Sequence, residues 1–181
     1  MYEVEVKVRA AHDAVRDKLA ALGATEVRTV TQADTYYNAP DRDFAETDEA
    51  LRIRREQTDD NTVSKVTYKG PLVEEHSKTR KEAETVVEDG ETMDRILTGL
   101  GYDATATVEK RRQFFCVDGY TVTLDDVTGL GEYVEVETEV AENIEPAREG
   151  VYELLRTLDL DPDAQIRTSY LGLLLEANNH E

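Results

Sequence analysis

The first nine residues alternate strictly between charged and apolar side chains, and this pattern limits the folds open to the chain. In an extended strand, the valines of residues 1–9 share one face, and Glu3, Glu5 and Lys7 share the other. A lone strand of this kind turns its charged face to water. Several later strands repeat the charged phase, so a sheet curled into a closed barrel would instead collect these charges in its interior. We predict that the chain builds such an interior.

The rest of the chain alternates short strand patterns with a few helical ones. Short turns join most of the strands, which favours an antiparallel sheet. The pattern predicts an α+β fold: an eight-stranded antiparallel closed tunnel barrel with four flanking helices, in one domain over residues 1–181. We expect strands at 1–9, 25–38, 51–55, 62–69, 77–87, 105–117, 120–127 and 132–140, and helices at 11–22, 90–100, 146–158 and 169–177.

Three details of this assignment depend on local signals. Residues 44–49 are expected to form an irregular link, and Gly70-Pro71 is expected to stop the fourth strand. The apolar stripe of residues 170–175 is expected to pack on the barrel, with closure of one tunnel mouth or a homodimer contact as alternatives.

Composition limits the partners. The chain has 21 basic and 40 acidic residues, a net charge of −19, so its outer surface would repel nucleic acid. A self-repelling surface is tolerated in concentrated salt, which favours the cytosol of a salt-accumulating halophile over an ordinary acidic protein. No apolar run, including residues 173–175, is long enough for a membrane span, and no signal peptide is apparent. One cysteine fits a reducing cytoplasm.

Charges that share the inward phase form a mixed set of acids and bases. Burying so many cations without a ligand would be costly, and a polyanion would offset that cost. The set comprises Glu3, Glu5, Lys7, Arg52, Arg54, Lys69, Lys78, Arg80, Glu82, Glu84, Lys110, Arg112, Asp125, Glu135 and Glu137.

Arginine and lysine bind phosphate oxygens, whereas carboxylates bind Mg²⁺ or Mn²⁺. The pairs Glu3/Glu5 and Glu135/Glu137 each point to one side of a strand and can share a metal. Bases and metal-binding acids on one concave face predict a site for a nucleotide or an inorganic polyphosphate.

Other residues are assigned to packing or to the surface. Tyr36 and Tyr37 are expected to serve packing more than ligand contact. Cys116 is expected to be a buried small hydrophobe. The remaining assignments are to the surface: His12, His76, His180, Arg55, Arg111 and Asp126.

The N-terminal Glu3-x-Glu5-x-Lys7 resembles the signature of the CYTH family, also called triphosphate tunnel metalloenzymes. The resemblance extends to about residue 140 and looks most like the class IV adenylate cyclase branch. It continues through Asp34-Thr35-Tyr36-Tyr37, Leu51-Arg52-Ile53-Arg54, Thr67-Tyr68-Lys69-Gly70-Pro71, Ser77-Lys78-Thr79-Arg80 with Glu82, Lys110-Arg111-Arg112, Leu124-Asp125 and residues 129–137.

The resemblance implies an eight-stranded tunnel that binds a triphosphate with a divalent metal, Mg²⁺ or Mn²⁺. By position it implies the metal ligands Glu3, Glu5, Glu135 and Glu137, and the phosphate-binding residues Lys7, Arg52, Arg54, Lys69, Arg80, Lys110 and Arg112. Glu3, Glu5, Lys7 and Asp125 are the implied catalytic residues.

Three functions remain open at this point. An adenylate cyclase would convert ATP to cyclic AMP and pyrophosphate. A triphosphatase would release orthophosphate from inorganic tripolyphosphate or thiamine triphosphate. A binding module would hold the same ligands without turnover.

Overall fold

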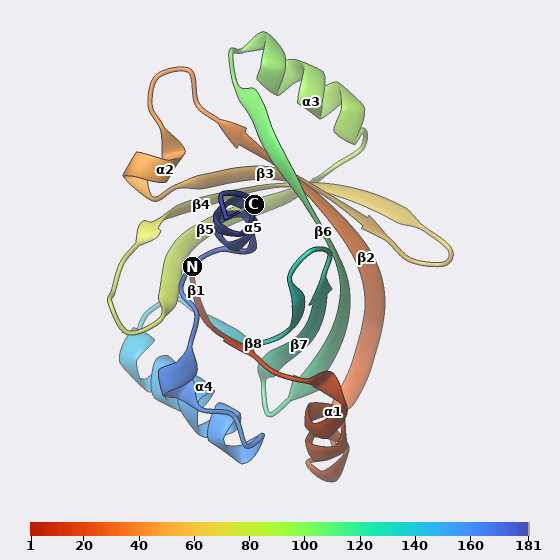
Figure 1. Cartoon of the computed structure of the whole chain (residues 1–181), viewed down its shortest axis with the longest axis vertical. Helices are drawn as coiled ribbons and strands as arrows, with labels where there is room; N and C mark the ends of the chain where they lie inside the picture. Colours follow the sequence, from red (N-terminus) through yellow and green to blue (C-terminus); the bar gives the residue numbers. More distant parts are fainter. Residues whose placement is uncertain (181) are drawn as a thin grey trace.

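The computed structural model describes residues 1–180, in which eight strands close into one antiparallel barrel (Figure 1). Around the barrel the strand order is β1-β5-β4-β3-β2-β6-β7-β8. The predicted closed tunnel barrel is therefore confirmed. The strands are β1 (Tyr2–Arg9), β2 (Thr25–Asn38), β3 (Ala50–Gln57), β4 (Thr62–Leu72), β5 (Lys78–Val87), β6 (Asp103–Val117), β7 (Tyr120–Val127) and β8 (Gly131–Val140).

The N-terminal strand closes the barrel because it pairs on both sides. One edge of β1 pairs with β5, where Glu5 lies opposite Lys78, and the other edge pairs with β8, where Glu5 lies opposite Glu137. These two pairings bring β1, β5 and β8 together in one part of the barrel wall.

Helices cover the outside of the barrel, and their positions explain which face of each strand is apolar. The helix α1 (His12–Ala21) contacts β8, and α4 (Ile144–Thr157) contacts β1 and β8. Figure 1 shows both helices outside the ring of strands. Val4, Val6 and Val8 are almost fully buried in the apolar layer beneath them. The apolar face of β1 therefore points outward, and its charged face points into the tunnel.

The remaining helices lie at other parts of the barrel. The helix α3 (Gly90–Gly99) contacts β3 and β6. A 3₁₀ turn (Pro162–Ala164) precedes the last helix, α5 (Tyr170–Asn178), which is seen within the outline of the ring in Figure 1. None of the helices in residues 1–180 combines the length and the apolar character needed to cross a membrane.

One predicted link is a helix. Residues expected to be irregular include the four-residue helix α2 (Phe44–Thr47). Asp43 caps it by accepting a hydrogen bond of 3.0 Å from the amide of Ala45, and Asp48 ends it in the left-handed conformation, at φ 55°. Residues 1–180 thus contain five α-helices, where four were predicted.

The structure corrects the prediction that Gly70-Pro71 stops β4. The strand continues to Leu72 because the pairing of β4 with β5 shifts register between Lys69 and Leu72. This irregularity accommodates a proline, which has no amide hydrogen for the ladder.

Two single-residue predictions were also wrong. His12 is buried, not on the surface, because the first turn of α1 packs against the barrel and places Nε2 2.9 Å from the carbonyl oxygen of Tyr133. Cys116 is exposed, not buried. Cys116 lies two and four residues after Phe114 and Arg112, so its side chain is on the same face of β6 as theirs. That face lines the tunnel, and Cys116 lies on it near the exposed end of the strand.

Candidate functional site: a charged tunnel

The inward faces of the strands enclose a cavity of about 880 Å³. Its wall includes every predicted metal-binding and phosphate-binding residue. The remaining predicted catalytic residue, Asp125, is fully buried in the wall behind them. Alternation along the strands therefore brings together charges that are distant in the sequence.

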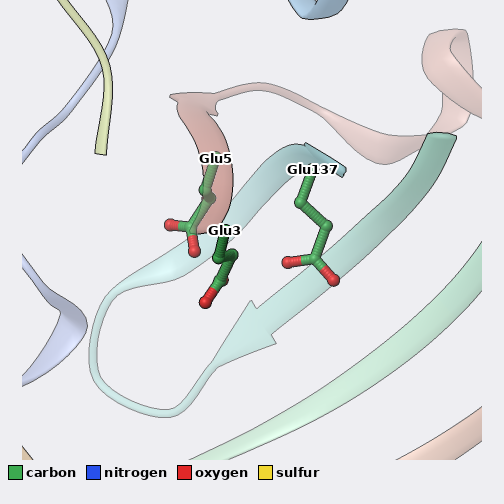
Figure 2. A group of neighbouring side chains, drawn as sticks. All are labelled: Glu3, Glu5 and Glu137. Carbon is green, nitrogen blue, oxygen red and sulfur yellow. The ribbon is translucent and has the colours of Figure 1, made fainter. Parts of the chain in front are cut away.

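Three carboxylates form a compact group on two neighbouring strands. Glu3 and Glu5 project from β1, and Glu137 projects from β8 (Figure 2). Each offers an oxygen that lies within 4.8 Å of the oxygens of the other two. This spacing allows one cation to contact all three side chains.

The electrostatics of the group favour a bound cation. Burial and the nearby charge of Glu3 raise the pKa of Glu137 to about 8. Burial also opposes ionisation of Glu5, but Lys78, Lys69 and Lys7 outweigh it and hold the pKa of Glu5 well below its usual range. Like charges thus crowd the group, and a divalent cation would relieve that repulsion.

The donor chemistry fits Mg²⁺ or Mn²⁺. All three side chains supply carboxylate oxygens, the hard ligands that these ions prefer. Lysines balance part of the charge: Lys69 Nζ donates to Glu3 at 2.8 Å, and Lys78 Nζ donates to Glu5 at 3.3 Å. Because lysine side chains are long and flexible, they can move aside for a metal.

A second cluster contains one acid among three bases. The guanidinium of Arg54 forms two hydrogen bonds of 2.7 Å to Asp34, which is fully buried. Lys110 Nζ lies 3.3 Å from the same carboxylate, and Arg52 lies 3.8 Å from it. These cations hold the pKa of Asp34 well below its usual range although burial opposes ionisation. One carboxylate therefore faces three cationic side chains.

This second cluster has capacity for an anion. Burial lowers the pKa of Lys110 to about 7, and the neighbouring Arg112 and Arg54 act in the same direction. The Nε of Arg52 is buried and has no hydrogen-bond partner within residues 1–180. A phosphate group would supply the missing acceptor and negative charge.

A third cluster lies around Arg112. Its Nε donates to Asp125 at 2.6 Å, and its Nη2 donates to Glu135 at 2.8 Å. The hydroxyl of Tyr170 donates to Asp125 at 2.6 Å. Glu135, which was predicted as a metal ligand, thus contacts Arg112. Glu137 belongs to the three-carboxylate group with Glu3 and Glu5.

The other predicted phosphate ligands lie along the same cavity. Lys69 lies between Glu3 and Glu82, at 2.8 and 3.0 Å. Arg80 is tethered by hydrogen bonds of 2.7 and 2.8 Å to the carbonyl oxygens of Asp48 and Gly70. As predicted, Arg55, Arg111 and Asp126 lie on the surface.

Sequence reasoning left several cavity residues out of the predicted site. Lys78 lines the cavity and was part of the predicted inward charged set, but no binding role was assigned to it. Lys65 also lines the cavity and was left out of that set, although it had the inward phase of its strand. Tyr36 and Tyr37 also contribute to its lining, and Tyr37 in addition packs in an apolar cluster and donates a hydrogen bond to Asp94. Tyr170 belongs to a C-terminal helix whose approach to the tunnel had no signal in strand periodicity.

Comparisons with known proteins agree with this geometry. The family model of the CYTH domain matches residues 1–170. A Methanocaldococcus jannaschii protein, named provisionally as an adenylate cyclase, is 40% identical over 176 residues, which cover 96% of this chain and 98% of that one. The adenylate cyclase CyaB of Aeromonas hydrophila is 30% identical over 137 residues, covering 75% of this chain and 68% of that one.

A solved structure shows the same architecture. A protein from Pyrococcus horikoshii OT3 superposes with a TM-score of 0.89 at 40% sequence identity. The match covers 96% of this chain and 98% of that chain.

Proposed function

The chain belongs to the CYTH domain family, and on that premise we propose that it is a metal-dependent adenylate cyclase that converts ATP to cyclic AMP and pyrophosphate inside its tunnel. The single observation that carries the proposal is that one cavity contains both a three-carboxylate group and a cluster of three cationic side chains, Arg52, Arg54 and Lys110, around one carboxylate. Carboxylates suit a divalent cation, and cations suit a polyphosphate, so the two halves of the site match a metal–triphosphate substrate.

The metal would be held by Glu3, Glu5 and Glu137, with Glu135 as a further candidate once Arg112 engages phosphate. When bound, Mg²⁺ or Mn²⁺ would neutralise phosphate oxygens and polarise the reacting phosphorus.

The chain's own cations have a separate task. Arg54, Lys110 and Arg112 would hold the oxygens of the triphosphate and offset negative charge as it builds on the leaving group. They are already oriented by Asp34 and Asp125, so little reorganisation is needed during the reaction.

In the proposed reaction, the 3′-oxygen of the ribose forms a bond to the α-phosphorus. The bond from that phosphorus to the bridging oxygen of pyrophosphate breaks, and the hydroxyl proton leaves to solvent. Positioning and electrostatic stabilisation supply most of the rate enhancement in phosphoryl transfer of this kind.

Apolar side chains in the cavity lining support a substrate with an organic part. Ala50 and Leu72 contribute to the lining from β3 and β4, and Leu171 and Leu175 contribute to it from α5. Inorganic tripolyphosphate has no apolar surface to place there, whereas a nucleoside has. The volume also falls in the range of roughly 300–1,000 Å³ that is usual for small-molecule sites.

Product analysis tests the proposal. The purified protein would be incubated in molar KCl with Mn²⁺ or Mg²⁺ and, separately, ATP, thiamine triphosphate and tripolyphosphate. We expect cyclic AMP and an equal amount of pyrophosphate from ATP. Orthophosphate without cyclic nucleotide would replace the cyclase by a triphosphatase acting through the same residues, and binding without turnover would replace both by a binding module.

A matched pair of variants assigns any turnover to the carboxylate group. Glu137→Gln should lose most metal-dependent turnover, because it removes one of the three oxygen ligands. Glu109→Gln changes an exposed carboxylate on β6 that is not among the residues lining the cavity, and it should retain activity. Equal activity of the two variants would contradict the proposed metal site.

A further inference from the structure

Tyr170 starts the C-terminal helix α5, yet its side chain reaches the tunnel wall. Its ring is buried against Val108 and Val127 and meets the ring of Tyr133 edge to face, at a centroid distance of 5.2 Å. Ser169 caps the helix by accepting a hydrogen bond of 3.0 Å from the amide of Gly172, which fixes the start of α5 beside the tunnel.

The hydroxyl of Tyr170 completes a chain of hydrogen bonds to an arginine. It donates at 2.6 Å to Oδ2 of Asp125, the same oxygen that accepts from Nη2 of Arg112. The other oxygen of Asp125 accepts from Nε of Arg112 at 2.6 Å. The hydroxyl thus fixes the carboxylate that orients the guanidinium. Asp125 has no solvent exposure, so water cannot replace the hydroxyl without a rearrangement.

The ring of Tyr170 contacts two further cations. The ammonium of Lys7 lies 4.2 Å from the ring centroid, and that of Lys110 lies 5.1 Å from it. Both lysines are almost fully buried, where an aromatic face attracts an ammonium more strongly than it does in water. Lys7 Nζ also donates to the carbonyl oxygen of Thr168 at 2.7 Å, so the segment leading into α5 holds the same lysine.

We infer that Tyr170 is a positioning residue for the phosphate-binding cations Lys7, Lys110 and Arg112, an inference that rests on the proposed function. These cations come from β1 and β6, and one side chain of the C-terminal helix contacts Lys7 and Lys110 directly and is linked to Arg112 through Asp125. The helix therefore contributes to the geometry of the reaction as well as to packing.

Two substitutions separate the hydroxyl from the ring. Tyr170→Phe keeps the ring and removes the hydrogen bond to Asp125, and we expect kcat for ATP to fall about tenfold. Tyr170→Leu removes both contacts, and we expect a fall of about a hundredfold. KM should change less than kcat in both variants, because Lys69 and Arg80 do not contact Tyr170 and still bind the substrate.

Binding is measured in parallel by titration calorimetry with tripolyphosphate. We expect the Kd of Tyr170→Phe to rise several-fold and that of Tyr170→Leu to rise further. The matched control is Tyr152→Phe, which removes a hydroxyl that bonds to the carbonyl of His76, outside the tunnel wall. Its kcat and Kd should stay within about twofold of wild type.

The outcomes distinguish this inference from the proposed function. Tyr170→Phe with wild-type kcat and Kd would overturn the positioning role, as would an equal loss in Tyr152→Phe. If the wild type binds tripolyphosphate but shows no turnover, the proposed enzymatic activity is wrong. The ratio of the Kd of Tyr170→Phe to that of the wild type would still test the positioning role. A wild type that binds no tripolyphosphate would overturn both.

Discussion

The two guanidinium nitrogens Nε and Nη2 of Arg54 donate to the two carboxylate oxygens of Asp34, each at 2.7 Å, inside the barrel. Asp34 also faces Lys110 and Arg52, so its single negative charge balances several buried positive ones. An acid from the tunnel's own wall therefore balances part of the positive charge that a bound polyanion would also neutralise.

Asp34→Asn should destabilise the ligand-free protein strongly. Removing one partner from a buried ionic cluster costs about 3–5 kcal/mol, because the remaining charges stay buried and unbalanced. We expect a loss of that size in the free energy of unfolding measured in urea. Added tripolyphosphate should recover much of it, because the anion supplies the missing charge.

The control for this prediction is an exposed ion pair. Lys18 and Asp159 lie 2.8 Å apart on the surface, where 73% of the Asp159 side chain is exposed. Asp159→Asn should cost less than about 1 kcal/mol and should not respond to tripolyphosphate. Similar losses in both variants would mean that the Asp34 cluster has no special role in balancing the tunnel.

Mn²⁺ should stabilise the wild-type protein through the carboxylate group. A ligand that binds only the folded state adds about 2.7 kcal/mol at a hundred times its Kd. We expect Mn²⁺ to raise the Tm of the wild type, and Glu5→Gln to lose most of that increase because it removes one carboxylate of the group. An undiminished increase in Glu5→Gln would place the Mn²⁺ elsewhere.

The lowered pKa of Lys110 should make the stability of the folded protein depend on pH. Its pKa falls from 10.5 to about 7 in the folded state, mainly through burial. Between those pH values the folded protein has released a proton that the unfolded chain retains, so this group adds stability as the pH rises. The gain is on the order of a few kcal/mol in total, builds up as the pH rises from about 7 toward 10.5, and is absent below about 7.

Lys110→Met tests this effect. Unfolding in urea at pH 7 and pH 9 should show a smaller gain with pH in the variant than in the wild type, because methionine has no proton to release. Lys7, whose pKa is lowered to about 8, should keep part of the gain in the variant. Equal gains in both proteins would show that Lys110 is not the source.

Concentrated salt should stabilise the protein. The net charge is −19, and repulsion between exposed acids weakens as the screening length falls to about 3 Å at 1 M salt. We expect the free energy of unfolding to rise from low to molar KCl. A constant value across that range would contradict a surface adapted to salt.

Strand periodicity predicted the barrel well because the pattern is local. The alternation of valines with Glu3, Glu5 and Lys7 determines which face of β1 is apolar, and closure of the sheet then turns the charged face inward. Helix α5 was also predicted from its apolar stripe. Its contribution to the tunnel lining was only an alternative to packing on the barrel, because a helical stripe does not specify the surface that it meets.

The contacts within the site depend on registers that no single strand encodes. Asp125 meets Arg112 because β6 and β7 place them opposite each other, and Glu137 meets Glu5 across the seam of β1 and β8. The sequence shows that Glu135 and Glu137 share one face of a strand. Only the strand register shows that Glu135 contacts Arg112, whereas Glu137 lies with Glu3 and Glu5. Such assignments require the three-dimensional pairing.

The pairing of β1 with both β5 and β8 also constrains how the protein matures. Glu3 and Glu5 are synthesised before their partner Glu137, which belongs to the last strand of the barrel. A nascent chain therefore carries an incomplete set of ligands until β8 emerges and the seam closes. Long-range pairing of this kind slows folding. If the proposed metal site is correct, metal affinity would then report closure of the seam between β1 and β8.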